Sequence, residues 1–232
     1  MALRLDRLLA SQGPWSRKEA KGLIKAGRVR VGDRVARRPE ERVDPLATPV
    51  FVDGEPLAYR RHRHVLVHKP PGVLSATRDP RAPTVLDLVP EELRRRDLGL
   101  AGRLDKDAEG LVLLTTDGEL AHRLTHPRWK VEKVYEVLLD APVGEAEARA
   151  FAEGLAGFAP AELLPLPGAR ARVTLREGKH HQVKRMFRAV GRRVLRLLRV
   201  RLGPLELGDL PRGAARALSD DEEAALYRAV GL

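Results

Sequence analysis

The segment AYRRHRH, residues 58–64, divides the chain into two parts. It is highly charged and has no apolar periodicity, which is typical of a linker. With 232 residues, the chain is long enough for a small domain followed by a medium-sized one. We therefore expect a domain over residues 1–58, a linker over 59–64 and a second domain over 65–232.

Positive charge is concentrated in the first part. Residues 1–64 contain 15 Lys and Arg against 8 Asp and Glu, so they carry +7 of the total net charge of +11. Such a basic chain favours a polyanionic partner, with nucleic acid as the first candidate. The absence of Cys excludes disulfides and thiolate chemistry. Because no apolar run reaches membrane-spanning length and no secretory leader is recognisable, we expect a cytoplasmic protein that does not enter a membrane.

The first part predicts two helices followed by a short sheet. LRLDRLLASQ is typical of a short helix, and SRKEAKGLIKAG predicts a second one that begins with a capping box of Ser16 and Glu19 and ends at Gly27. The basic face of this helix continues into GRVRVGDRV, an alternating strand that turns at Gly32. A basic helix face is usually only solvated, but its continuation into an Arg-bearing strand favours binding of nucleic-acid phosphates. The candidate residues are Arg17, Lys18, Lys21, Lys25, Arg28 and Arg30.

The second part mixes strand and helix patterns without the regular spacing of parallel βαβ units. Strands are expected at VLVHK, GLVLLTTDG, KVYEVLLD, ARVTLREG and VLRLLRVRLGPLEL. Helical segments are expected at TVLDLVP, PEELRRRD, GELAHRLTH, GEAEARAFAEGLAG and HHQVKRMFRAVG, and a capped helix start at LSDDE. The whole pattern predicts an α+β protein, whose second domain is built on a mixed, largely antiparallel sheet with flanking helices.

The loop GRLDKDAEG, residues 102–110, places Asp105 and Asp107 beside Arg103 and Lys106, directly before an apolar strand. It lacks the glycine spacing and the Lys-Ser/Thr pair of a phosphate-binding loop, so no nucleotide cofactor is expected. An Asp in a polar loop is most often solvated or turn-forming. The alternative for this loop is carboxylate chemistry without a metal.

Several histidines raise the possibility of a metal site. Glu119, His122 and His126 fall at helical spacing, and His180 and His181 lie downstream. The HExxH order is absent and no Cys is available, so we expect no metal here. A structural or RNA-facing role is the favoured interpretation of His122 and His126.

Three segments, GRLDKDAEGLVLLTTDG, KVYEV and EGKHHQVKRMF, resemble the signature segments of pseudouridine synthases of the RsuA type. HKPPGVLSATRDP, THP and LPRGAARALSDDEE extend the resemblance along the chain. SRKEAKGLIKAGRVRVGDRV resembles the small RNA-binding domain named after the fourth small-subunit ribosomal protein. The resemblance implies an enzyme that detaches uracil from its ribose, rotates it and rejoins it through carbon, with neither metal nor organic cofactor.

The resemblance also implies roles for the charged loop. Asp105 matches the essential carboxylate, which can attack the anomeric carbon or the pyrimidine ring, or stabilise positive charge on the sugar. Arg103 matches the residue that occupies the space left by an everted nucleotide. Asp107 is expected to support Asp105 or to be solvated.

Further roles follow from the same resemblance. Tyr135 is expected to stack on the target uracil and to serve as a base, and Lys184 to pair with the catalytic carboxylate and keep it ionised. Arg185 is expected to contact phosphate, Leu197 to form an apolar wall under the uracil, and Lys69 to contact RNA. Lys179 and His180 depart from the family pattern, which puts local RNA contacts there in doubt.

The segments HHQVKRMFRAVG and EKVYEVLLDAPV look more like the branch of the family that modifies small-subunit RNA. We therefore expect the protein to act on 16S rRNA, in a small-subunit assembly particle. A monomer is expected as well, although no sequence pattern indicates the oligomeric state. Modification of 23S rRNA is one alternative. Another is a noncatalytic RNA-binding assembly protein with a decayed synthase fold, and a metal-dependent nuclease is a distant third.

Overall fold

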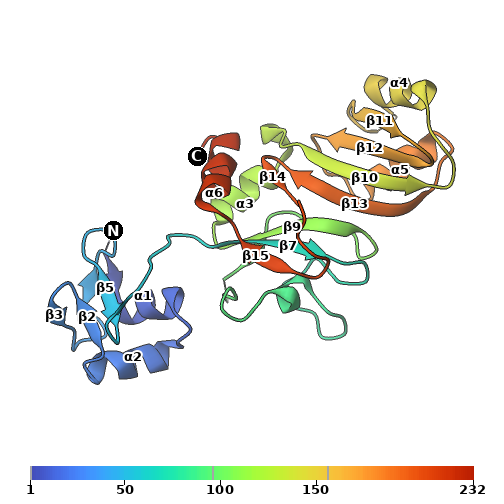
Figure 1. The fold of residues 1–232 in the computed structure, drawn as a ribbon. Coiled ribbons are helices and arrows are strands. Elements are labelled where there is room, and N and C mark those ends of the chain that lie inside the picture. Colours follow the sequence, from blue (N-terminus) through green and yellow to red (C-terminus); the bar gives the residue numbers. More distant parts are fainter. Residues whose placement is uncertain (1, 96, 156) are drawn as a thin grey trace. The chain divides into compact units, whose positions relative to one another are not determined.

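The computed structural model describes residues 2–95, 97–155 and 157–232. The chain forms two compact units, Met1–Arg61 and His62–Leu232 (Figure 1). The α+β fold class expected from the sequence is confirmed. Among the described residues, no helix is long and apolar enough to cross a membrane.

The first unit contains two helices and short antiparallel strands. The second helix begins as expected: the Ser16 hydroxyl accepts from Glu19 N, and the Glu19 carboxylate accepts from Ser16 N, at 3.2 and 2.7 Å. Gly27 follows the helix with φ +77°, the left-handed conformation that ends many helices. The elements are β1 (Leu3–Arg4), α1 (Leu5–Gln12), α2 (Arg17–Lys25), β2 (Val29–Val31), β3 (Arg34–Val35), β4 (Arg42–Val43), β5 (Val50–Val52) and β6 (Glu55–Pro56). β1 pairs with β4, and the other strands form a sheet in the order β3-β2-β5-β6.

The second unit is built on a sheet in the order β11-β12-β10-β13-β9-β7-β15. Its pairings are antiparallel except for β9 with β13, among the strands that the structure describes. The strands are β7 (His64–Lys69), β9 (Glu109–Thr115), β10 (Lys133–Leu139), β11 (Glu162–Leu166), β12 (Arg170–Leu175), β13 (Val194–Leu202) and β15 (Ala215–Ala217), with β8 (Gly99–Leu100) beside β9 and β14 (Leu205–Glu206) beside β13. The close approach of β13 to β9 requires glycine at position 110: its φ is +117°, and a Cβ there would lie 2.3 Å from the Arg199 carbonyl oxygen.

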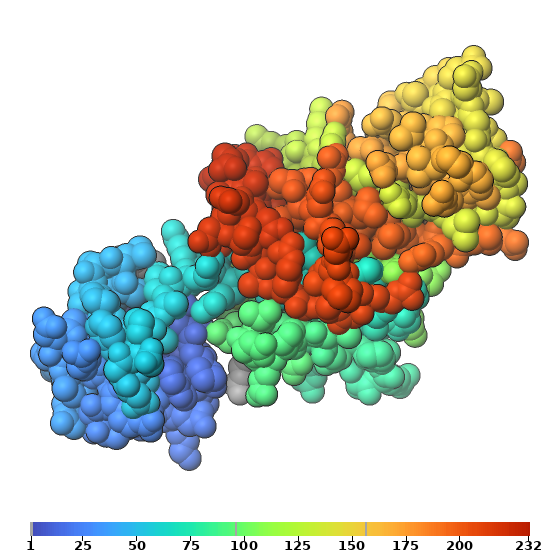
Figure 2. Space-filling view, viewed as in Figure 1, coloured from blue at the N-terminus to red at the C-terminus, as the bar shows by residue number. Residues whose placement is uncertain are grey.

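Helices cover this sheet on both faces. Leu120 of α3 and Leu226 of α6 pack with Leu111 and Leu113 of β9 on one face. Phe151 of α4 and Phe187 of α5 pack on the other face, in the cluster that also holds Tyr135. The helices are α3 (Gly118–Thr125), α4 (Glu145–Glu153), α5 (Gln182–Ala189) and α6 (Asp220–Ala229), and the 3-10 turns are Val85–Leu88 and Pro127–Trp129. Figure 2 shows the residues of α4 and β11, in yellow and light orange, gathered at one end of this unit.

One local prediction needs correction, and one observed strand was not predicted. The segment PEELRRRD forms turns rather than a helix over residues 90–95, and Arg96 lies outside the described residues. The strand β11 contains Pro165 and has no strand pattern in the sequence. The strand tolerates Pro165 because it lies at the edge of the sheet and pairs with β12 alone among the described strands. The missing N–H of a proline costs no hydrogen bond when that position faces away from the neighbouring strand.

Candidate active site

The loop that carries Asp105 is fixed from two sides by residues near the end of β7. Ser75 Oγ donates to the Leu104 carbonyl and accepts from Leu104 N, at 2.8 and 2.9 Å. Lys69 Nζ donates to the Lys106 and Ala108 carbonyls at 3.1 and 2.7 Å, and also to its neighbour Pro70. These bonds hold the backbone on both sides of Asp105.

The prediction that Lys69 contacts RNA is wrong. Its side chain is fully buried, and its ammonium group is used by three backbone carbonyls. Burial lowers the pKa of Lys69 to about 8, against the opposing effect of nearby carboxylates, Asp107 first. Lys69 therefore shapes the loop from inside the fold. The sequence could not show this, because burial of Lys69 depends on how the loop folds over the end of β7.

The carboxylate of Asp105 lies between two groups of the α5 segment. Lys184 Nζ is 3.3 Å from Asp105 Oδ2, and His181 Nε2 is 3.5 Å from Asp105 Oδ1. The Asp105 side chain is 24 % exposed, which leaves it accessible to a substrate. Each carboxylate oxygen thus faces a different nitrogen-bearing side chain.

Asp107 shares Lys184 with Asp105. Lys184 Nζ donates to Asp107 Oδ1 at 2.6 Å, a shorter contact than the one to Asp105. This hydrogen bond lowers the pKa of Asp107, although partial burial works against the shift. Lys184 thus lies between the two carboxylates. Asp107 is the more exposed of the two, because its side chain is 74 % exposed.

His181 is the residue near Asp105 that sequence reasoning did not assign to the site. It adopts the left-handed conformation, with φ +51°, immediately before α5, and its ring stacks on that of His180 at 3.8 Å between centroids. The buried Gln182 holds this turn, since its amide accepts from Lys179 N and donates to the Glu177 carboxylate at 3.0 and 2.6 Å. The two consecutive histidines are visible in the sequence, but no local pattern indicates that His181 lies beside Asp105.

Tyr135 and Leu197 are part of the apolar core of the second unit. Both are buried, at 8 % and 6 % exposure, on neighbouring strands β10 and β13. They belong to the same apolar cluster as Leu104 and Val183, the chain neighbours of Asp105 and Lys184. The two strands therefore contribute Tyr135 and Leu197 to the same core as the chain neighbours of Asp105 and Lys184.

Two predicted RNA contacts of this unit are exposed. Arg103 precedes the loop aspartates and forms no ion pair among the described residues. The Arg185 guanidinium lies over the Phe158 ring, 4.9 Å from its centroid. Both side chains remain available to phosphate.

The basic residues of the first unit fall into two groups. Lys18, Lys21 and Lys25 are exposed on α2 and make no ion pair within the described part of the chain. The arginines have protein partners: Arg17 contacts the buried Asp6 at 3.3 Å, Arg28 makes two hydrogen bonds to Asp53 at 2.7 and 2.6 Å, and Arg30 lies over Phe51. Of the six candidate residues, the three lysines are thus the ones without a side-chain partner in the described part of the chain.

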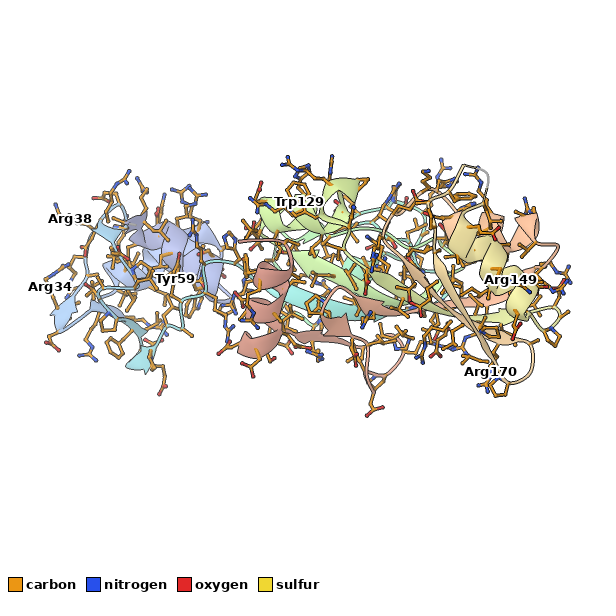
Figure 3. All side chains as sticks on the ribbon, turned by 90° about the horizontal axis from the view of Figure 1, so that it is seen from above. Arg34, Arg38, Tyr59, Trp129, Arg149 and Arg170 are labelled. Carbon is orange, nitrogen blue, oxygen red and sulfur yellow. The ribbon has the colours of Figure 1, made fainter. Side chains whose placement is uncertain are left out.

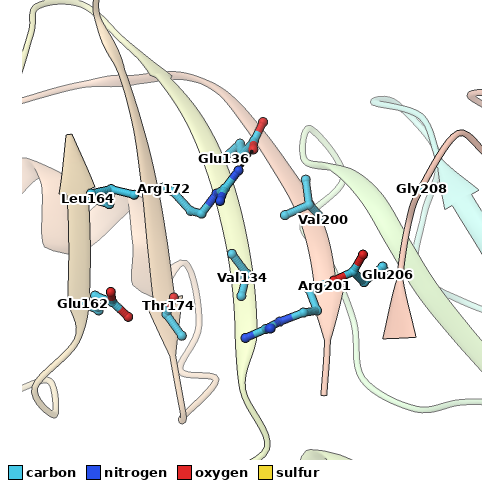
Figure 4. Close-up of a pocket in the computed structure, with 10 residues that line it drawn as sticks. All are labelled: Val134, Glu136, Glu162, Leu164, Arg172, Thr174, Val200, Arg201, Glu206 and Gly208. Atoms are coloured by element: carbon cyan, nitrogen blue, oxygen red, sulfur yellow. Dashed lines mark hydrogen bonds and ion pairs between the residues drawn. The ribbon is translucent and has the colours of Figure 1, made fainter. Parts of the chain in front are cut away.

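A groove of about 510 Å³ lies elsewhere on the second unit (Figure 4). Its floor includes Val134 and Glu136, which flank Tyr135 on β10 and, by strand alternation, face the other side of the sheet. An ion pair of 2.8 Å between Glu136 and Arg172 crosses this groove. The groove is therefore separate from the surroundings of Asp105. Its lining residues are Val134, Glu136, Glu162, Leu164, Arg172, Thr174, Val200, Arg201, Glu206 and Gly208.

Comparisons with known proteins agree with this arrangement. Residues 63–157 match the model of the RNA pseudouridylate synthase family, and residues 3–45 match that of the S4 domain. An uncharacterized RNA pseudouridine synthase of Aquifex aeolicus is 43% identical, over 98% of both chains. The ribosomal small subunit pseudouridine synthases A of Pseudomonas aeruginosa and Escherichia coli are 44% and 40% identical, covering 95% and 97% of this chain and 98% and 100% of theirs.

A solved structure leads to the same family. The crystal structure of a pseudouridylate synthase superposes with a TM-score of 0.66 at 32% identity, covering 97% of this chain and 99% of the other. The family resemblance seen in the sequence is thereby confirmed. The chain belongs to the RNA pseudouridylate synthase family and carries an S4 domain in its first unit.

Proposed function

We propose that this protein converts one specific uridine of 16S rRNA into pseudouridine, with Asp105 as the catalytic carboxylate. The observation that carries the proposal is the Asp105 carboxylate, accessible on a clamped loop and flanked by Lys184 and His181 at 3.3 and 3.5 Å. The choice of 16S rRNA is supported by relatives named ribosomal small subunit pseudouridine synthase A, at 40–44% identity.

The reaction breaks the bond between the ribose and a ring nitrogen of uracil and forms a bond from the ribose to a ring carbon. That carbon loses a proton and the released nitrogen gains one, so nothing is oxidised or reduced. An ionised Asp105 can form a covalent bond with the substrate or stabilise positive charge on the sugar. Lys184 pairs with the carboxylate and orients it, Tyr135 stacks on the uracil and accepts the proton, and Leu197 supports the ring.

RNA contacts outside the reacting nucleotide complete the proposal. Arg103 occupies the place vacated by the everted nucleotide, and Arg185 binds a phosphate. Residues 1–58 act as an RNA-binding domain through Arg17, Lys18, Lys21, Lys25, Arg28 and Arg30, joined by residues 59–64 to the catalytic domain, 65–232. The enzyme works as a cytoplasmic monomer on a small-subunit assembly particle, without metal or organic cofactor.

The test supplies the purified protein with 16S transcript, with partly assembled small subunits and, separately, with 23S transcript. Pseudouridine should form at one position of 16S RNA and nowhere in 23S RNA. Modification confined to 23S RNA would overturn the choice of substrate and leave the isomerase function standing. No modification of any of these RNAs would contradict the catalytic proposal.

A further inference from the structure

A cluster of aromatic and basic side chains lies on α3 and on the segment that joins α3 to β10. We call it the Trp129 cluster, and Figure 3 shows Trp129 beside the green ribbon of α3. The His122 and His126 rings lie 5.2 Å apart between centroids, and each meets the Trp129 ring edge to face, at 5.7 and 5.5 Å. The guanidinium groups of Arg123 and Arg128 lie 5.4 and 5.6 Å from the Trp129 centroid.

One of these arginines is committed to the fold. The Arg123 guanidinium donates to the Val230 and Gly231 carbonyls and to the Glu119 carboxylate, at distances of 2.7 to 3.0 Å. It ties α3 to the end of α6 and supports the indole from the protein side. The same bond directs Glu119 away from the histidines, and no group of three metal-binding side chains occurs in the described residues.

The other side of the cluster is exposed and supplies donors. Arg128 is exposed, and its guanidinium makes no hydrogen bond or ion pair among the described residues. His126 Nδ1 accepts from Arg128 N at 3.2 Å, so a neutral His126 carries its proton on Nε2, where it is a donor. Lys130, which ends the turn in the left-handed conformation with φ +49°, is also exposed. Packing of the core explains the partly buried indole, but it does not explain the unpaired cations and exposed rings around it.

The Trp129 cluster borders the loop that carries Asp105. A Cβ placed on Gly102 would lie 3.4 Å from Thr125 Cγ2, so the end of α3 packs against the residue next to Arg103. On its other side the segment leads directly into β10, the strand of Tyr135. The cluster thus connects the two segments to which the catalytic roles are assigned.

We propose that the Trp129 cluster binds an unpaired nucleotide of the substrate RNA near the target uridine. The base stacks on the Trp129 and Arg128 planes, and His126 and Arg128 donate to the adjoining phosphate. This inference rests on the proposed function. It adds a second contact point that holds the RNA while the target nucleotide is everted. A single-stranded segment is the partner because a paired base offers no free face for stacking.

Fluorescence tests this contact directly, because the chain contains two Trp residues. Replacing Trp15 of the first unit by Phe leaves Trp129 as the only indole. A short single-stranded oligouridylate should quench its emission saturably, whereas a duplex RNA of equal length should not. Binding is followed independently by the anisotropy of labelled RNA. Unchanged Trp129 emission at RNA concentrations that saturate the anisotropy signal would overturn the proposal.

Kinetics provide the second test, in the full-length protein. Trp129→Leu, which keeps an apolar side chain for the core, should raise KM roughly fivefold to a hundredfold, the range expected for one lost stacked base, and should change kcat less than KM. Arg128→Ala should raise KM and reduce the salt dependence of binding by about 0.7 in the slope. Arg149→Ala is the matched control, since it removes an exposed arginine of α4, away from Trp129 in Figure 3.

The outcomes separate the two proposals. If Trp129→Leu melts at a lower temperature, Arg128→Ala decides, because its side chain is exposed and outside the core. If Arg128→Ala and Arg149→Ala have equal KM values, the Trp129 cluster does not bind the RNA. Normal pseudouridine formation by the wild type would still leave the proposed function intact. Quenching of Trp129 emission without any pseudouridine formation would support RNA binding by the Trp129 cluster and contradict the proposed isomerase function.

Discussion

At the scale of single residues, Asp105 and Asp107 both contact the ammonium group of Lys184. Lys184 approaches Asp105 at 3.3 Å and Asp107 at 2.6 Å, yet the side chain of Asp107 is 74 % exposed. Distance alone would choose Asp107 as the partner of Lys184. Partial burial of the Asp105 side chain, at 24 % exposure, together with its second contact to His181, favours Asp105 as the reacting group.

We predict that Asp105→Asn lowers turnover by about 10⁴-fold with little change in RNA affinity, because it removes a nucleophile while keeping the shape of the side chain. Asp107→Asn serves as the matched control and should cost much less. Turnover and RNA binding are measured on both variants. A larger loss for Asp107→Asn would move the catalytic role to Asp107.

A second prediction concerns His181, whose imidazole faces the other oxygen of Asp105. His181→Ala should lower kcat about tenfold, the size expected when one close polar contact to a charged group is lost. His181→Asn should recover part of the activity, since Asn tolerates the left-handed backbone and retains an N–H donor. His180→Ala is the control for loss of ring stacking. Equal kcat values for the Ala and Asn variants would show that the donor at position 181 does not act on Asp105.

At the scale of elements, the last helix is anchored by charge at its start. Arg216 donates to both oxygens of Glu222, at 2.7 and 2.6 Å, and Glu222 also accepts from Ser219 N at 2.9 Å. The hydrogen bonds from Arg216 are the main reason that the pKa of Glu222 falls to about 2. The helix in turn brings Tyr227 to the Asp117 carboxylate at 2.8 Å, which secures the start of α3.

Glu222→Gln should therefore reduce the free energy of unfolding by about 1 kcal/mol at pH 7, a value that allows for the partial exposure of the pair. The folded-state pKa lies below the ordinary value of 4.5, so the stabilisation is present above pH 4.5 and is lost as the pH falls towards about 2. Urea unfolding at pH 7 and pH 3 should show the difference from wild type shrinking at the lower pH. Asp221→Asn is the control, because it removes a neighbouring charge without such contacts, and it should reduce the free energy of unfolding less at pH 7. If the destabilisation by Glu222→Gln is the same at both pH values, the ion pair with Arg216 is not its cause.

At the scale of the whole molecule, the two units differ in the residues that they contribute. The first unit presents exposed lysines on α2, and the second carries the loop of Asp105. Because phosphate binding is electrostatic and the chemistry depends on local geometry, charge on the first unit should affect affinity and leave the chemical step unchanged.

Replacing Lys18, Lys21 and Lys25 together by Gln should weaken RNA binding and reduce the slope of log affinity against log salt by roughly 2 to 3, since each lost phosphate contact contributes about 0.7–0.9. The rate at saturating RNA should stay within about twofold of wild type, because no residue next to Asp105 changes. Titrations at several salt concentrations measure the slope. An unchanged slope would mean that α2 does not touch the RNA.

The sequence by itself determined the features that depend on neighbours along the chain. The capping boxes at Ser16 and Ser219 occur where the pattern predicted them, because a cap needs only residues three positions apart. Strand alternation and the family motifs likewise predicted the α+β class and the charged loop before Glu109. The pairing of Lys184 with Asp105 was implied by the family resemblance, but only the tertiary structure showed that His181, from the turn before α5, also meets Asp105 and that Lys69 reaches the loop from β7. The reason is that sheet order and loop packing set both the burial of a lysine and the partner of a carboxylate, and neither property belongs to a local stretch of residues.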